Sequence, residues 1–268
     1  MRRSRGSSRP WWRANSSSCP TLNAFGSSTW WPHASTVASP WWPAWQAPAL
    51  RTPLRSRRRP RDVGADALIA MPPYVGGTNR AQIFDYYEAI ARAARLPLMI
   101  QNAGPPVGTP LAVEDLIELV ERVPEIVAIE QETSPNPQTV GRIVEAGDGR
   151  LEGVFGGLGG IYLFNELRRG ATGTMPACQF ADVAVQVFDL YHEGDEDRAR
   201  EVYADLQPAL VMERLYEMTF MKECLKRRGV IDTAVTRVPE TPMDAADHAE
   251  LDRIWNALGT HFTWHAGK

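Results

Sequence analysis

The stretch LPLMIQNAGPPVGTPLAVEDLIELVERVPEIVAIEQ, residues 96–131, decides the fold. Its first seven residues, LPLMIQN, form an apolar run that we interpret as a buried strand. Residues 109–123 are predicted as a helix, because Thr109 suits the N-cap and Pro110 the first turn. EIVAIEQ, residues 125–131, is again typical of a strand. The stretch therefore predicts one strand–helix–strand unit.

The same alternation extends on both sides of this unit. Further strands are predicted over residues 64–71, 151–157 and 171–177, and further helices over residues 79–94, 137–147 and 161–170. Five strands with four intervening helices indicate a parallel sheet with right-handed crossovers. A barrel fits better than a doubly wound sheet, because no strand leads into a convincing dinucleotide loop. Helices alone follow, over residues 181–193, 195–228 and 245–258.

The first 62 residues follow no such pattern. They are rich in Arg, Ser, Pro and Trp, and hold seven of the nine tryptophans. Frequent prolines would interrupt most helices and central strands. We interpret residues 1–62 as a disordered segment or as the product of a wrong reading frame. A transit peptide and a basic arm that binds RNA or an acidic partner are the alternatives. The predicted division is thus 1–62, a barrel part over 63–176, and C-terminal helices over 177–268.

Charge and cysteine content limit the possible partners. All 32 acidic residues and 18 of the 29 basic ones lie in residues 62–268, so the ordered part is acidic and nucleic acid is not an expected partner. No apolar run approaches the length of a membrane span. Cys19, Cys178 and Cys224 are spaced neither as a zinc site nor as a disulfide framework. We therefore expect a reduced, cytoplasmic compartment and no membrane association.

Five motifs in order resemble one known family. They are GADALIAMPPY (64–74), PLMIQN (97–102), PEIVAIEQE (124–132), GVFGGLGG (153–160) and RRGATGTMP (168–176). Their order and spacing, with the helical tail, are similar over about 195 residues to the dihydrodipicolinate synthase / N-acetylneuraminate lyase family of Schiff-base aldolases. The resemblance implies a (β/α)8 TIM barrel with a C-terminal helical appendage. The recognisable strands would be the fourth to the eighth, and the region that should carry the first three is aberrant.

The family's chemistry needs an amine that this chain lacks at the matching place. Family members use a lysine at the end of the sixth strand to form an imine with pyruvate or another 2-keto acid, and a tyrosine at the end of the fifth strand to relay protons. Here the lysine position is Glu130 and the tyrosine position is Gln101. The chain's lysines, Lys222, Lys226 and Lys268, all lie beyond the barrel strands.

The resemblance also implies a set of substrate-binding positions and an assembly. The positions are Tyr74, Asn102, Gly157, Thr174 and Met175. A small 2-keto acid would be the ligand, no cofactor is implied, and family members commonly form homo-oligomers, dimers or tetramers. The Tyr- and Met-rich stretch 215–221 is interpreted as core packing or a subunit interface.

Three functions remain open at this point. The chain could be an aldolase or dehydratase of the family, impaired by Glu130. It could be a relative that binds a keto acid, or nothing, without catalysis. It could also be a different lyase or hydratase that uses Glu130 as a base, because Glu130 and Glu132 lie two apart on a strand and share a side. Two carboxylates could bind a divalent cation or share a proton. We expect no metal site, and we interpret His261 and His265 as part of a frayed tail.

Overall fold

The structure, a computed structural model, describes residues 66–73, 78–104 and 108–264. Residues 1–62 and Tyr74, for which the sequence makes predictions, lie outside the described residues. In chain order the elements are β1 (Leu68–Ala70), α2 (Arg80–Ala94), β2 (Leu98–Asn102), α3 (Val113–Arg122), β3 (Ile126–Gln131), α4 (Asn136–Gly147), β4 (Gly153–Gly156), the 3-10 turn η5 (Leu158–Gly160), α5 (Leu163–Leu167), β5 (Gly173–Thr174), the 3-10 turn η6 (Cys178–Phe180), α6 (Ala181–Glu193), α7 (Glu196–Arg227) and α8 (Ala245–Leu258). The alternation of strand and helix up to β5 confirms the predicted order of elements.

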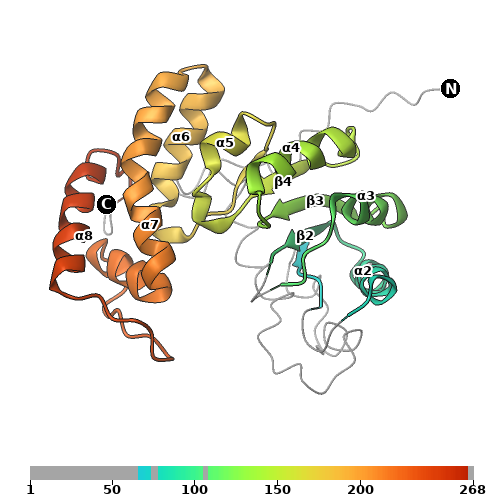
Figure 1. Ribbon diagram of the computed structural model, residues 1–268, viewed down its shortest axis with the longest axis horizontal. Coiled ribbons are helices and arrows are strands. Elements are labelled where there is room, and N and C mark those ends of the chain that lie inside the picture. Colours follow the sequence, from blue (N-terminus) through green and yellow to red (C-terminus); the bar gives the residue numbers. More distant parts are fainter. Residues whose placement is uncertain (1–65, 74–77, 105–107, 265–268) are drawn as a thin grey trace.

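The five strands form one sheet in the order β1-β2-β3-β4-β5, and every neighbouring pair is parallel. Helices α2, α3 and α4 lie along one side of the strands (Figure 1). The predicted parallel sheet is therefore confirmed, as a part of a barrel wall with helices on its outer side.

Two apolar clusters lie on opposite sides of this sheet. Strand residues such as Leu98, Ile100 and Ile129 pack with α2, α3 and α4 in the outer cluster. Met99, Ala128 and Phe155 form a second, smaller cluster, with Ile69, Val127 and Met175 partly buried against it. Because side chains alternate along a strand, the second cluster marks the inner side of the sheet.

Side-chain caps mark the starts of α2, α7 and α8, whereas α3 begins later than predicted. Asn79 and Gln82 form a capping box at the start of α2, and Asp244 and Asp247 do the same for α8. Helix α3 begins at Val113, and its N-cap is Ala112 rather than Thr109. The Thr109 hydroxyl instead donates to the Pro73 carbonyl (3.0 Å). A contact between distant segments therefore overrides the local N-cap signal.

The elements around β5 are shorter than predicted. Helix α5 covers Leu163–Leu167 instead of 161–170, and β5 covers Gly173–Thr174 instead of 171–177. Gly170, with a positive φ of 85°, lies in the turn between α5 and β5. Among the described strands β5 pairs with β4 alone, and the pairing comprises two residue pairs.

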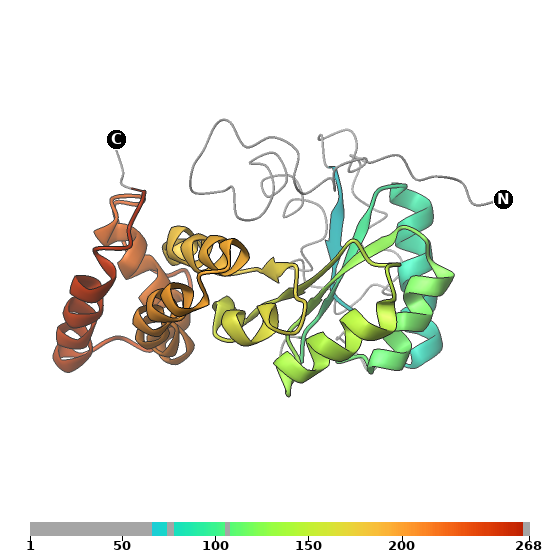
Figure 2. The same cartoon turned by 90° about the horizontal axis from the view of Figure 1, so that it is seen from above.

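The C-terminal helices pack on one another and on α5. Seen from above, α6, α7 and α8 gather at the end of the molecule opposite α2 and α3 (Figure 2). Their shared core includes Phe180, Val187, Phe220 and Leu251. The bounds of α6 and α8 agree with the predicted ranges. Helix α7 is interrupted at Glu217, whose φ is 43°. Among the described helices, none is both long and apolar enough to cross a bilayer.

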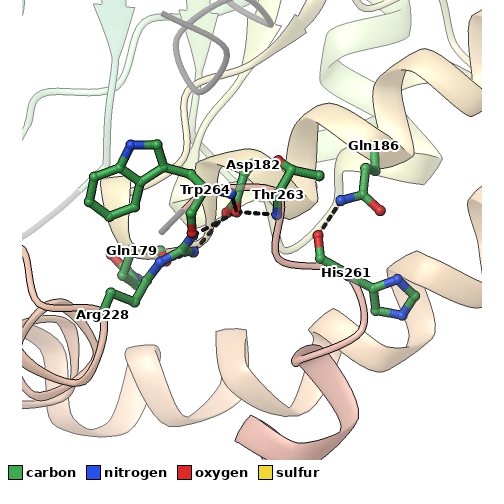
Figure 3. A network of polar contacts seen from close by, with 7 residues as sticks. All are labelled: Gln179, Asp182, Gln186, Arg228, His261, Thr263 and Trp264. Carbon is green, nitrogen blue, oxygen red and sulfur yellow. Dashed lines mark hydrogen bonds and ion pairs between the residues drawn. The ribbon is translucent and has the colours of Figure 1, made fainter. Parts of the chain in front are cut away.

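The tail after α8 is docked, which corrects the prediction of a frayed end for His261. The Asp182 carboxylate accepts hydrogen bonds from the backbone N–H groups of Thr263 (3.1 Å) and Trp264 (3.2 Å), as Figure 3 shows. The His261 Nε2 atom lies 2.9 Å from Asp205 Oδ2. His265 lies outside the described residues. These contacts attach the tail to α6 and α7, and sequence spacing alone could not reveal them.

Candidate functional site at the carboxyl end of the strands

Two rows of residues lie side by side where the parallel strands end. Strand register aligns Gln101, Glu130, Phe155 and Gly173 in one row, and Asn102, Gln131, Gly156 and Thr174 in the next. Phe155 belongs to the inner cluster, so the first row faces the inside of the strand ring. The second row faces the helices. In barrels of this architecture the carboxyl ends of the strands carry the active site, so the first row is the candidate site.

Glu130 is the central acid of the inner row. Its side chain is buried, with 4% of its surface exposed, and it makes no side-chain hydrogen bond to a described residue. Burial raises the pKa of the Glu130 carboxyl well above its usual range, and the neighbouring Glu132 and Glu166 raise it further. Burial and the two neighbouring acids therefore all favour the protonated form of Glu130.

Both side-chain oxygens of Glu132 accept hydrogen bonds. Its Oε1 accepts a hydrogen bond from the backbone N–H of Leu158 (2.9 Å), and its Oε2 accepts one from Gln101 Nε2 (3.1 Å). The site thus combines Glu132, whose side chain accepts hydrogen bonds from two donors, with the buried acid Glu130 two residues away.

A third acid, Glu166 on α5, lies on the helix-facing side of β4. Burial, and then the charge of Glu132, raise the pKa of Glu166 to about 8. Asn136 Nδ2 donates to Glu166 Oε1 (2.9 Å), while Glu166 Oε2 and Asn136 Oδ1 have no described partner. An unpartnered, buried oxygen on Glu166 agrees with the raised pKa, because a charged carboxylate would need further donors there.

The predicted substrate-binding residues do not all face the inside. Asn102 is fully buried on the helix-facing row, where its amide bonds Leu111 N (2.8 Å), Leu111 O (3.1 Å) and Gln131 Oε1 (2.8 Å). Thr174 shares that row and faces Gly160. Strand alternation turns both side chains away from the inner row, and their contact with a substrate stays a prediction.

Gly157 and Met175 lie closer to the inner row. A Cβ atom at position 157 would lie 2.5 Å from Glu132 Cγ, so this glycine borders the carboxylate directly. Met175 is partly buried against the inner cluster, and its N–H donates to the Gly156 carbonyl (2.9 Å). Their contact with a ligand stays a prediction.

Sequence reasoning missed Glu166 and Asn136. One signal was available, because Glu166 follows the buried Leu163 by three residues and so lies on the apolar face of α5. An acid on such a face is either paired or protonated. Asn136 offers no comparable signal, because its partner lies 30 residues away.

The cation alternative gains no support from the described residues. Among them, no three His, Cys, Asp or Glu side chains are grouped so that they could hold a metal ion. Glu132 already has donors on both oxygens.

The architecture and the site define a class. Parallel strands with outer helices, polar side chains at their carboxyl ends and a helical appendage describe a partial (β/α)8 barrel. The profile of the Dihydrodipicolinate synthetase family matches residues 47–258, which is most of the chain. The chain belongs to this family. The match begins ahead of the boundary at residue 62 that composition suggested.

Two relatives show how much of the family's length is present. The chain is 30% identical over 204 residues to the L-2-keto-3-deoxyarabonate dehydratase of Azospirillum brasilense, covering 75% of this chain and 66% of that protein. It is 30% identical over 215 residues to a 4-hydroxy-tetrahydrodipicolinate synthase of Corynebacterium aurimucosum, covering 77% and 67%. The chain therefore spans about two thirds of the length of these relatives.

Solved structures show the same fold. The dihydrodipicolinate synthase of Rhodopseudomonas palustris superposes with a TM-score of 0.67 at 23% identity, covering 74% of this chain and 68% of that one. YagE of E. coli K12, solved in complex with pyruvate, also gives a TM-score of 0.67, at 22% identity, covering 75% and 68%. At these identities the likeness shows the fold alone.

Proposed function

We propose that this chain binds a small 2-keto acid at the carboxyl end of its strands, as a lyase-family barrel that does not form an imine. Support for the ligand class comes from the relatives, which are named as an L-2-keto-3-deoxyarabonate dehydratase and a 4-hydroxy-tetrahydrodipicolinate synthase, and from the neighbour solved with pyruvate. The observation that carries the proposal is the placement of Glu130 on the inner row beside Gln101.

Imine formation requires a nucleophilic amine within reach of the keto carbon. A carboxyl group cannot supply it, and no lysine lies on the described strands. Lys222 and Lys226 lie on α7, where Lys222 Nζ donates to the Val235 carbonyl (2.6 Å). Lys268 lies outside the described residues. The aldolase mechanism of the family is therefore not expected from this chain.

Two measurements on the wild-type chain test the proposal together. Calorimetry with pyruvate should show binding, and treatment with borohydride in the presence of pyruvate should leave the protein mass unchanged. A pyruvate adduct on any residue, found by mass spectrometry, would contradict the absence of imine chemistry. Absence of binding by pyruvate and by longer keto-deoxy sugar acids would contradict the ligand class.

A second candidate function uses the acids directly. Dehydration of a 2-keto-3-deoxy acid needs a base that removes a proton from the carbon beside the keto group. It also needs an acid that protonates the hydroxyl leaving as water, while a C–C double bond forms. Because burial raises the pKa of Glu130, this candidate assigns Glu130 as the acid and Glu132, two residues away, as the base, which reverses the role that the sequence suggested for Glu130. Turnover that is insensitive to borohydride and lost in Glu130→Gln would support it, and an unchanged rate in that variant would exclude it.

We also propose that the chain forms homo-oligomers. Val211, Leu215 and Met218 are exposed apolar residues of α7, and such residues suit a subunit contact. One solved neighbour is described as a monomeric dihydrodipicolinate synthase variant, so assembly differs among relatives. Light scattering after size-exclusion chromatography should give a dimer or a tetramer; a monomer at every concentration would contradict the proposal.

A further inference from the structure

The carboxylate of Glu132 is held as a bound ligand would be. Each of its oxygens accepts one hydrogen bond, and the donors come from different elements: the N–H of Leu158 after β4, and the side-chain amide of Gln101 on β2. Glu132 itself follows the end of β3, and its N–H donates to the Asn102 carbonyl (3.0 Å). Three neighbouring strands thus converge on one carboxylate.

The loop after β4 is shaped around this carboxylate. A Cβ atom at Gly157 would lie 2.5 Å from Glu132 Cγ and 2.7 Å from Cδ, so any larger residue would displace the side chain. Leu158 adopts a left-handed φ of 53°, which is unusual for a residue with a Cβ atom. Backbone held in a rarely populated conformation at a strand end is typical of binding sites.

We propose that the Leu158 N–H and the Gln101 amide form a carboxylate-binding subsite, and that Glu132 is its tethered occupant. A small carboxylic acid enters this subsite only by displacing Glu132. The inference deepens the proposed function and rests on it for the identity of the natural ligand, whose carboxylate would take the place of the Glu132 carboxylate. The subsite itself requires only the carboxylate group.

A tethered occupant lowers the apparent affinity for any external carboxylate. The apparent dissociation constant equals the intrinsic one divided by the fraction of molecules in which the subsite is open. Removal of the Glu132 carboxylate leaves the two donors in place and makes that fraction close to one.

The test uses the full chain and formate, the smallest carboxylate. Glu132→Ala should bind formate at least ten-fold more tightly than the wild-type chain, measured by NMR titration of the Leu158 and Gln101 N–H signals. Addition of Gln101→Leu to Glu132→Ala should remove most of this gain. Glu145→Ala, which removes an exposed acid from α4, is the matched control and should leave formate affinity at the wild-type value.

A second variant covers the case in which Glu132→Ala does not fold. Glu132→Gln keeps the side-chain volume but loses the charge and one acceptor oxygen, so it should gain formate affinity in the same direction by a smaller factor. If neither variant binds formate more tightly than the wild-type chain, the subsite proposal is overturned.

The two proposals can fail separately. Because formate has no keto group, formate binding by Glu132→Ala supports the subsite even if pyruvate and longer keto acids do not bind any variant. Conversely, pyruvate binding that is equal in the wild-type chain and in Glu132→Ala would support the ligand class and contradict the subsite.

Discussion

Two groups of buried and half-buried acids in this chain have opposite surroundings. Asp182 on α6 accepts two hydrogen bonds from the Arg228 guanidinium (2.8 and 2.6 Å) and two from backbone N–H groups, so its charge is fully compensated. Around Glu130, Glu132 and Glu166 the described residues place no cation, and burial with mutual repulsion raises the pKa of Glu130 and of Glu166. The acid paired with a cation is part of the architecture, whereas buried acids without a cation, with raised pKa values, are typical of sites that handle ligands or protons.

The largest effect should come from breaking the compensated pair. In the wild-type chain the side chains of Arg228 and Asp182 are 5% and 1% exposed. Arg228→Met would therefore leave Asp182 buried without its cation. Removing one partner of a buried ion pair costs about 3–5 kcal/mol. We expect urea unfolding to show a loss of this size, together with release of the tail after α8. A loss below about 1 kcal/mol would contradict the view that the pair is buried and structural.

A smaller effect is expected where Gly157 borders Glu132. Gly157→Ala would bring a Cβ atom into contact with the Glu132 side chain and should destabilise the chain by about 1–3 kcal/mol. In Glu132→Ala the same glycine substitution should cost much less, because the obstructing side chain is absent. A double-mutant cycle by urea unfolding measures this coupling; additive effects would show that the two residues do not touch.

The pH dependence of stability distinguishes the uncompensated acids. The pKa of Glu166 is raised to about 8 in the folded chain, above the usual glutamate range near 4.3 of an unfolded chain. The folded state therefore binds the proton more tightly, so this contribution to stability is fully present below about pH 4 and is lost as pH rises through about pH 8. Each pH unit in that window removes at most about 1.4 kcal/mol for one group.

Glu166→Gln is the variant with which the pH dependence of the wild-type free energy of unfolding is compared. Its amide oxygen can accept from Asn136 Nδ2 and its side chain cannot ionise, so we expect stability to fall less steeply between pH 5 and 8 than in the wild-type chain. Glu130, and Glu213 with a pKa raised to about 6 by burial, leave a residual slope of the same sign in both proteins. Identical slopes would show that Glu166 is already ionised when folded.

The smallest effect should come from an exposed ion pair. Arg253 and Glu250 on α8 lie 3.2 Å apart, with side-chain exposures of 80% and 46%. Exposed pairs of this kind contribute about 0–1 kcal/mol. Arg253→Met should leave the free energy of unfolding within about 0.5 kcal/mol of wild type. A loss as large as that of Arg228→Met would remove the contrast between buried and exposed pairs.

Much of the fold follows from local patterns in the sequence. The alternation of strand and helix, the parallel order and the bounds of α6 and α8 could be predicted, because capping residues and apolar spacing act within a few residues. The late start of α3 could not, because it depends on contacts outside the helix: the Thr109 hydroxyl donates to the Pro73 carbonyl, and the Asn102 amide bonds both backbone groups of Leu111.

The candidate site was predictable only in part. Glu130 and Gln101 follow from motif positions and strand alternation. The pairing of Glu166 with Asn136 and the docking of the tail on Asp182 join residues 30 and more than 80 positions apart. Such contacts depend on how the elements pack, which no single stretch of sequence encodes.

The most direct test of the central claim restores the missing amine. Glu130→Lys places an amine on the inner row, whereas Glu145→Lys adds one to the exposed face of α4. After borohydride treatment with pyruvate, mass spectrometry should find one reduced pyruvate adduct on residue 130 of the first variant and none on the second. A folded Glu130→Lys protein without an adduct, or equal labelling of the two variants, would contradict the placement of Glu130 at the reacting position.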